Sequence, residues 1–599
     1  MDKQKRRDEI SNEYKWDLTS IFKTDEDYYC MLEVVKKDLN LFDCFKEDLL
    51  TSAKRLLEYL ETKITFERKL YRLYFYAHLN LDADTTNTQY QKMDKEITDL
   101  MSKFSENISF VNPLFMETNY EVIKNFYEEE PALKKHKFNI DNLYRFKNHT
   151  LSKDAEKLIS SMNKVFENPS ETYSILTDTD LKFDTIIAED GKEVELTESN
   201  YRKYISSIDR SVRKNAFEKL FKVYKSFKNT ITSIYNGDID SSIAISKIRK
   251  YNSSLEASLY TDNVEINVYN NLIDTVNNNL FVLHKYFETV KNVLKLDELH
   301  LYDLYVPLIK EDKSYYEYDE ARKIVISALS ILGEDYIENL NKAFDQKWID
   351  VYNNVGKRGG AYSSGFYDTN PYILLNYEGK LNDVSTLAHE LGHSMHSYYS
   401  CKNNEYQNSS YTIFVAEVAS TVNELLLCKH LLKESKDKNE KLSILNRLME
   451  LFKSTIYRQT MFAEFEKGIY EKRENDEVLT HEVISNYYYD LNKKYFGSNI
   501  VVDELISYEW ERIPHFYYNF YVYKYATGLS AACYIVESII NNKENALENY
   551  LSFLKTGGSD YPIEELKIAH VDMNDKKVVE SAIKMFNETI DEFNKLNNS

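Results

Sequence analysis

Apolar and charged residues alternate at helical spacing over most of this chain. The pattern is clear from residue 1 to about 110, for example in LLEYLETKITFERKLYRLYFYAHLNL at 56–81, and it resumes from 199 to about 299. Apolar side chains that recur every three or four residues line one face of an α-helix. We therefore expect a mostly helical protein, with a further small helical module at about 115–175.

Two segments break the helical pattern. Residues 177–197 combine β-branched residues, alternation and a turn at Gly191, which predicts a short hairpin. We place a lobe boundary here, with a helical N-terminal lobe at 1–198 and a second lobe at 199–599. Residues 351–377 place four glycines among tyrosine and valine, which predicts a small sheet whose edge strand lies just before the next helix. Such an edge can pair with an extended peptide. A purely structural hairpin is an equal alternative.

The segment LNDVSTLAHELGHSMHSYY at 381–399 carries the strongest chemical signal. Asn382 or Asp383 can cap a helix, and an apolar stripe follows at Val384, Leu387, Leu391, Met395 and Tyr398. His389 and His393 are four residues apart and project side by side from the opposite face, with Glu390 next to the first. This H-E-x-x-H arrangement holds zinc between two imidazoles, while the glutamate acts on the metal-bound water. The alternative is a pair of surface histidines on an amphipathic helix.

A catalytic zinc needs a third protein ligand. The apolar helical pattern at 411–430 contains Glu417 and Glu424, seven residues apart on one face. Burying an acid there is costly unless a metal or a partner compensates it. We predict Glu417 as the ligand and Glu424 as the acceptor of an N–H from a zinc-bound histidine. The alternative for both is a solvated carboxylate. His396 is expected to form local hydrogen bonds and not to bind the metal.

Composition narrows the class of protein. The chain has 599 residues, of which 43% are hydrophobic, with 14 Gly and 7 Pro, which favours long helices in two or more lobes. The net charge of −21 argues against nucleic acid as a partner and favours neutral or cationic ligands. Five scattered cysteines indicate reduced thiols. Because we find neither a secretory signal nor a long apolar run, we expect a soluble cytoplasmic protein with no membrane partner.

Residues 512–528 (RIPHFYYNFYVYKYATG) are rich in side chains that donate hydrogen bonds. At helical spacing, Tyr518, Tyr521 and Tyr525 would share one face, with His515 one turn earlier. Aromatic stripes of this kind are more often core, but several tyrosine hydroxyls are expensive to bury without partners. We therefore expect this face to line a polar cleft.

HELGH at 389–393, FVAEVASTVNE at 414–424 and RIPHFYYNFYVYKYATG at 512–528 together closely resemble oligoendopeptidase F, within the thimet-oligopeptidase-like zinc metallopeptidases. The resemblance includes WDL at 16–18, DLYVP at 303–307 and GKRGGAY at 356–362, so it spans nearly the whole chain. It implies a clam-like, two-lobed helical molecule with a deep internal channel and a small β-sheet beside the active-site helix. It implies an oligopeptidase-F-type module at about 115–180 and a zinc metallopeptidase catalytic domain at 199–599.

The resemblance also implies the site. One Zn²⁺ per chain would be held by His389, His393 and Glu417, with Glu390 as general base. Transition-state donors would be His515 and nearby tyrosines; we choose Tyr518 and Tyr525, with Tyr521 and Tyr523 as alternatives. We expect an endopeptidase that hydrolyses internal bonds of short oligopeptides, whose backbone is held by Gly360, Ala361 and Tyr362. Alternatives are a metal-dependent carboxypeptidase or dipeptidase, and an inactive peptide-binding protein.

Overall fold

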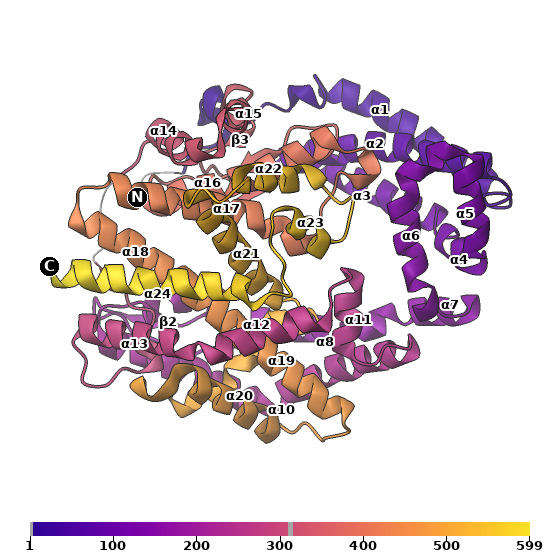
Figure 1. Ribbon diagram of the computed structural model, residues 1–599. Coiled ribbons are helices and arrows are strands. Elements are labelled where there is room, and N and C mark those ends of the chain that lie inside the picture. Colours follow the sequence, from indigo (N-terminus) through magenta and orange to yellow (C-terminus); the bar gives the residue numbers. More distant parts are fainter. Residues whose placement is uncertain (1–3, 310–314) are drawn as a thin grey trace. The chain divides into compact units, whose positions relative to one another are not determined.

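Helices form nearly all of the regular structure in this computed structural model, which describes residues 4–309 and 315–599 (Figure 1). This confirms the prediction of a mostly helical protein. The chain divides into two compact units, each made of three separate stretches of sequence. Among the described residues, we find no helix whose length and apolar character would let it span a membrane.

The first unit comprises the described parts of Met1–Thr150, Lys313–His430 and Ser538–His570. Its helices are α1 (Asp25–Asp38), α2 (Ala53–Ala83), α3 (Thr88–Asn107), α4 (Val111–Glu117), α5 (Tyr120–Glu129), α6 (Lys137–Arg145), α14 (Tyr318–Leu329), α15 (Glu334–Asp345), α16 (Leu381–Asn403), α17 (Ile413–Glu434, as far as His430), α22 (Ala546–Thr556) and α23 (Pro562–Ile568).

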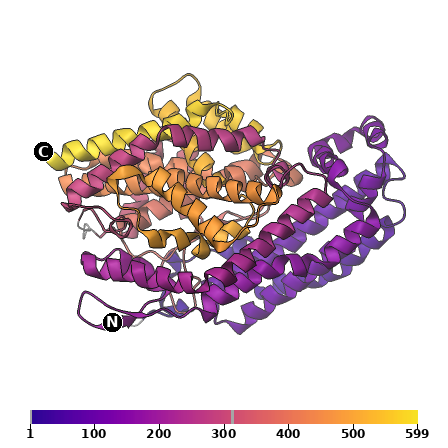
Figure 2. The same cartoon turned by 90° about the horizontal axis from the view of Figure 1, so that it is seen from below.

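The second unit comprises the described parts of Leu151–Asp312, Leu431–Glu537 and Val571–Ser599. Its helices are α7 (Lys153–Ser161), α8 (Asn163–Ile175), α9 (Glu198–Ile205), α10 (Arg210–Ile248), α11 (Ser254–Thr261), α12 (Ile266–Asn278), α13 (Leu280–Leu294), α18 (Lys438–Phe452), α19 (Arg458–Glu474), α20 (His481–Phe496), α21 (Tyr523–Ile540, as far as Glu537) and α24 (Lys576–Asn598). The C-terminal helix α24, yellow in Figure 2, packs against α12, α13 and α18.

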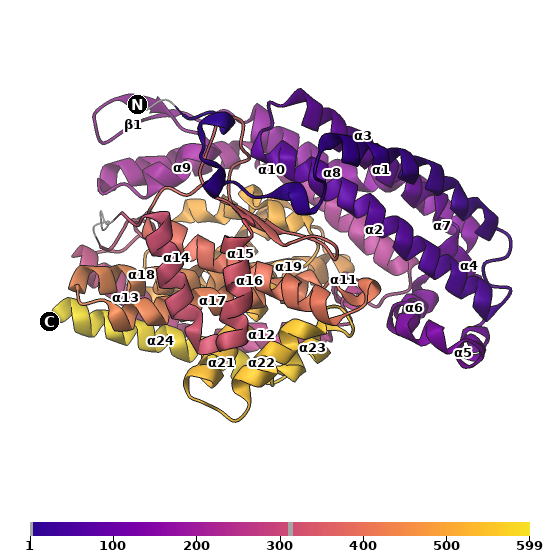
Figure 3. The same ribbon diagram turned by 90° about the horizontal axis from the view of Figure 1, so that it is seen from above.

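In the first unit, α2 and α3 lie side by side (Figure 3). The side chain of Ser52 accepts the backbone N–H of Arg55 and so caps the start of α2. Phe66 and Phe104 pack with their rings tilted and their centroids 4.6 Å apart, which joins the apolar faces of the two helices. This pairing follows from the helical periodicity seen in the sequence.

A small three-stranded sheet lies beside α16 in the same unit. Its strands are β3 (Ile349–Asp350), β4 (Tyr362–Ser364) and β5 (Tyr372–Leu374), in the order β3-β5-β4. β5 pairs parallel with β3 and antiparallel with β4, with Ser363 opposite Ile373. The predicted small sheet is therefore confirmed. The strand just before the helix is the central β5, however, so our expectation of an edge strand there was wrong; the edge strand packed on α16 is β4.

The predicted hairpin is also present, as β1 (Thr185–Ile187) paired antiparallel with β2 (Glu193–Glu195). Gly191 has a φ of +77°, which a glycine adopts without strain. The hairpin packs against α10 within the second unit. The predicted domain division at 198/199 follows chain order, and the compact units group the chain by packing instead. That division stays a prediction.

Candidate metal centre

Helix α16 starts at Leu381 and carries the two histidines in its middle. Asp383 accepts the backbone N–H groups of Lys380 at 2.9 Å and of Glu378 at 3.0 Å, which caps the helix start. Four members of the predicted stripe are fully buried, namely Val384, Leu387, Leu391 and Met395. Tyr398 is only half-buried and Tyr399 is buried in its place. The buried face fixes α16 in the unit and leaves His389 and His393 partly accessible.

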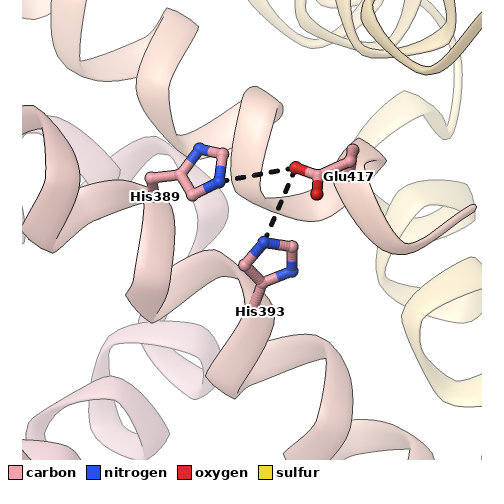
Figure 4. A group of neighbouring side chains, drawn as sticks. All are labelled: His389, His393 and Glu417. Atoms are coloured by element: carbon pink, nitrogen blue, oxygen red, sulfur yellow. Dashed lines mark ion pairs between the residues drawn. The ribbon is translucent and has the colours of Figure 1, made fainter. Parts of the chain in front are cut away.

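His389, His393 and Glu417 bring their donor atoms together (Figure 4). One oxygen of Glu417, Oε2, lies 3.4 Å from Nε2 of His389 and 3.6 Å from Nε2 of His393. In a tetrahedral zinc site the donors lie about 2.0–2.1 Å from the metal, and hence about 3.4 Å from one another. Two imidazole nitrogens and a carboxylate oxygen at this spacing therefore fit a zinc ion.

Close contact between α16 and α17 places Glu417 opposite the histidines. Gly392 permits this contact, because a Cβ there would lie 2.5 Å from Cα of Ser420 and 2.7 Å from the carbonyl oxygen of Ala419. Asn423 is fully buried and donates to the carbonyl oxygen of Ala388 at 3.1 Å. We had not singled out Gly392 or Asn423 from the sequence. The only signal was a glycine in the middle of a helical segment.

Glu424 lies behind the first histidine, with its Oε2 3.4 Å from Nδ1 of His389. A carboxylate at Nδ1 keeps the proton on that nitrogen and leaves Nε2 free to bind a metal. Burial lowers the pKa of His389, but hydrogen bonds to Glu417 and Glu424 outweigh it and raise that pKa to about 10. Burial lowers the pKa of His393 to about 4.

Glu390 is buried next to the three candidate metal ligands. Its side chain is 7% exposed and accepts a hydrogen bond from the backbone of Ser363 on β4. Burial raises the pKa of Glu390 to about 7, although His389 partly opposes this. A carboxylate with a pKa near neutrality both accepts and returns a proton readily.

His396 lies outside this group. Its ring stacks on Tyr411 with centroids 3.7 Å apart and contacts Phe553 of α22. Burial lowers its pKa to about 3. Nδ1 has no hydrogen-bond partner among the described residues, so the hydrogen bonding that we expected of this histidine is not seen at that nitrogen.

The three proposed substrate-binding residues lie at the start of β4. Gly360 has a φ of +84°, and its carbonyl oxygen accepts a hydrogen bond from Asn376 at 2.7 Å. The hydroxyl of Tyr362 donates to Asp82 of α2 at 2.8 Å, so this side chain anchors the strand. Ala361 is half-buried between them. Ser363 also connects β4 to α16, because its Oγ lies 2.8 Å from Oγ of Ser394.

His515 and its tyrosines belong to the second unit. The prediction of one helix over 512–528 was wrong: a 3₁₀-helix covers Pro514–Tyr517, and α21 begins only at Tyr523. Between them, Asn519 and Phe520 have φ angles of +48° and +58°, which interrupt helical hydrogen bonding.

A turn, and not a shared helix face, gathers the aromatic rings. The centroid of His515 lies 5.7 Å from that of Tyr518, 6.4 Å from Tyr521 and 6.0 Å from Tyr525. The hydroxyl of Tyr525 is 3.5 Å from Nε2 of His515. Tyr523 is fully buried and packs on Tyr269. Of the four tyrosines considered, Tyr523 therefore points into the core.

The comparisons with known proteins agree with the resemblance found in the sequence. Residues 203–585 match peptidase family M3, and residues 115–183 match oligopeptidase F. Oligopeptidase PepF of Bacillus subtilis (strain 168) is 42% identical over 590 residues, which cover 98% of this chain and 88% of that protein.

Two crystal structures match nearly the whole chain. A protein from Chlamydophila abortus aligns with a TM-score of 0.93 at 39% identity, covering 99% of this chain and 100% of that one. Oligoendopeptidase-F from Enterococcus faecium aligns with a TM-score of 0.74 at 35% identity, covering 97% and 99%. Together with the family match over most of the sequence, these similarities show that the chain belongs to peptidase family M3, in its oligoendopeptidase F group.

Proposed function

We propose that this chain is a zinc-dependent endopeptidase that hydrolyses internal bonds of short oligopeptides, with Glu390 as its general base. Membership of peptidase family M3 supports the coarser statement, a metalloendopeptidase acting on oligopeptides. The observation that carries the finer proposal is the convergence of two imidazole nitrogens and one carboxylate oxygen beside a buried glutamate.

His389, His393 and Glu417 would hold the metal, and the proton on Nδ1 of His389 would be retained by Glu424. When bound, zinc lowers the pKa of water and polarises a carbonyl group. Glu390 then removes the proton from the attacking water and returns it to the leaving amine. The hydrogen bond from the Ser363 backbone, which holds the buried carboxylate beside β4, supports this role.

The substrate would run along the free edge of β4. Gly360, Ala361 and Tyr362 would hold the peptide backbone there, as an added strand, through those of their N–H and C=O groups that neither β5 nor Asn376 occupies. His515, Tyr518 and Tyr525 would donate hydrogen bonds to the oxyanion. Loss of one such donor commonly lowers kcat by about 100- to 1000-fold.

The decisive experiment compares the wild type with Glu390→Gln on a mixed pool of oligopeptides, with products identified by mass spectrometry. We expect internal cuts by the wild type that disappear in the variant, because an amide cannot accept the proton. Zinc content measured in parallel should be equal, since Glu390 is not a ligand. Glu378→Gln removes an exposed carboxylate near the start of α16 and serves as the matched control.

The products separate the alternatives. Release of single residues or dipeptides from chain ends alone would indicate a carboxypeptidase or dipeptidase. Peptide binding without cleavage in the zinc-loaded wild type would indicate an inactive binding protein. Equal cleavage by wild type and Glu390→Gln would refute Glu390 as the base.

A further inference from the structure

A groove of about 630 Å³ in the second unit lies outside the metal centre. We call it the serine groove and define it by Asp238, Ser241 and Ser242 on α10, Ser254 and Ser258 on α11, and Tyr518. Ser241 and Ser242 are adjacent on α10, and Ser254 and Ser258 lie one turn apart on α11. Their hydroxyl oxygens can accept hydrogen bonds from a ligand.

Asp238 lies within this groove without a compensating charge. It is 7% exposed, and its Oδ2 is buried with no hydrogen-bond partner among the described residues. An ionised carboxylate is costly to bury unless a cation or several donors reach it. Burial raises the pKa of Asp238 to about 7, so a cation bound in the groove would favour the ionised carboxylate that the described residues do not otherwise stabilise.

Lys524 contributes a positive charge to the lining of the groove, but it is already paired with another carboxylate. Its Nζ lies 2.6 Å from Asp262, at a site where both side chains are largely buried. Glu167 adds a second, exposed carboxylate at the groove. Tyr518 is 55% exposed and offers a ring face on which a cation can rest. A carboxylate, hydroxyl oxygens and an aromatic ring together complement a positively charged group that carries N–H donors.

The groove wall is also the turn that carries the proposed oxyanion donors. Asn519 is held there by Ser242, which donates to its Oδ1 at 3.0 Å, and by Ser258, which donates to its carbonyl oxygen at 2.8 Å. Tyr470 donates to the same Oδ1 at 2.8 Å. A ligand in the serine groove thus lies against the segment that gathers Tyr518 and Tyr521 around His515.

We propose that the serine groove binds a positively charged group of the peptide substrate, with the Asp238 carboxylate as its counter-ion. This inference rests on the proposed function, since it names the kind of peptide that the enzyme prefers. The cation can be the α-ammonium of the peptide or the side chain of a lysine or arginine. Each presents positively charged N–H donors to Asp238.

The test uses one internally cleaved peptide that contains a lysine, together with its N-acetylated form and its form with norleucine in place of lysine. We expect one of the two altered peptides, each of which lacks one of the two positive charges, to lose at least about tenfold in kcat/KM with the wild type, the size of one charge-assisted hydrogen bond. A lower kcat/KM for the acetylated peptide identifies the α-ammonium as the bound cation. A lower kcat/KM for the norleucine peptide identifies the lysine side chain. Equal kcat/KM for all three forms overturns the proposal.

Asp238→Asn keeps the shape of the groove and should reduce this preference to within about twofold, because the counter-ion is lost. Asp240→Asn is the matched control, because Asp240 lies on the same helix, is exposed and pairs with Arg473 at 2.7 Å. The preference should persist in Asp240→Asn. If it also persists in Asp238→Asn, or is lost in both, the assignment is wrong.

A binding measurement separates this proposal from the proposed function. Calorimetric titration of the same three peptides into full-length Glu390→Gln, with and without Asp238→Asn, needs no cleavage. A preference for the cationic peptide that Asp238→Asn removes supports the groove even if the wild type cleaves nothing. Should Asp238→Asn fail to fold by circular dichroism, Ala257→Leu fills the groove without a charge change and should abolish the same preference. If the preference for the cationic peptide is unchanged in Ala257→Leu, the proposed role of the serine groove is refuted.

Discussion

Glu424 is placed to act on the proposed metal without touching it. Its Oε2 lies 3.4 Å from Nδ1 of His389, on the far side of the ring from Glu417. Without this acceptor the imidazole can rotate or take the wrong tautomer. At this scale the function depends on which nitrogen carries the proton.

Glu424→Gln should therefore weaken zinc binding by roughly 10- to 100-fold while the fold is kept. Competition with a chromophoric chelator measures the affinity directly. Glu434→Gln, at the exposed end of the same helix, should leave the affinity unchanged. Equal affinities of Glu424→Gln and the wild type would show that Glu424 does not orient His389.

At the scale of the helix, the distance between α16 and α17 sets how close Glu417 lies to His389 and His393. A helix interior normally loses stability with glycine, by about 1 kcal/mol relative to alanine. Gly392 is nevertheless placed where any Cβ would meet the backbone of Ser420 and Ala419. The close approach of the two helices outweighs the helix preference at this position.

Gly392→Ala should consequently lower both the melting temperature and the zinc content, because the added Cβ would lie 2.5 Å from Cα of Ser420 and the two helix backbones must shift apart. Gly359→Ala is the control, since a Cβ added there would meet nothing within 4 Å and the φ of Gly359 is not positive. Scanning calorimetry and metal analysis on both variants give the comparison. A Gly392→Ala protein that is more stable and fully loaded would contradict this account.

Local sequence patterns predicted which helices and strands form better than they predicted where these elements end or which other elements they pack against. The metal helix, Glu417, Glu424, the hairpin and the small sheet follow from periodicity and motif spacing, which are local properties. The turn after Tyr518 was missed because helical spacing of the tyrosines continues through it, while Asn519 and Phe520 adopt positive φ held by contacts from α10 and α11. The central place of β5 depends on the distant strand β3, which no local pattern reveals.

The charge of the whole molecule bears on its ligands and on its response to pH. A net charge of −21 raises the local concentration of cations, and so favours both a divalent metal and a cationic peptide. Inside the molecule, the pKa of a buried carboxyl group depends on whether it has a charged partner. Glu509 is paired with Arg458 at 2.7 Å, which holds the pKa of Glu509 below its usual value despite burial. Glu511 is fully buried and neither carboxyl oxygen has a hydrogen-bond partner among the described residues.

These two acids should affect stability in opposite directions as pH changes. Burial raises the pKa of Glu511 to about 9, so the folded state holds a proton that the unfolded state releases near its ordinary pKa of 4.5. The stabilisation from Glu511 is complete below pH 4.5 and is lost progressively as pH rises towards 9. For Glu509 the pKa is lowered, so its contribution is present above pH 4.5 and is lost as pH falls through the folded pKa.

Glu511→Gln should therefore raise the melting temperature relative to the wild type by more at pH 8.5 than at pH 5, because the amide never ionises. Glu509→Gln should lower the melting temperature at both values, since Arg458 then loses its counter-ion inside the protein. Thermal unfolding followed by circular dichroism at the two pH values, in one buffer series, measures both effects. A Glu511→Gln effect that is the same at pH 5 and pH 8.5 would mean that this carboxyl is already ionised in the folded protein, with its charge met by Lys228, whose attraction is the one opposing force on its pKa.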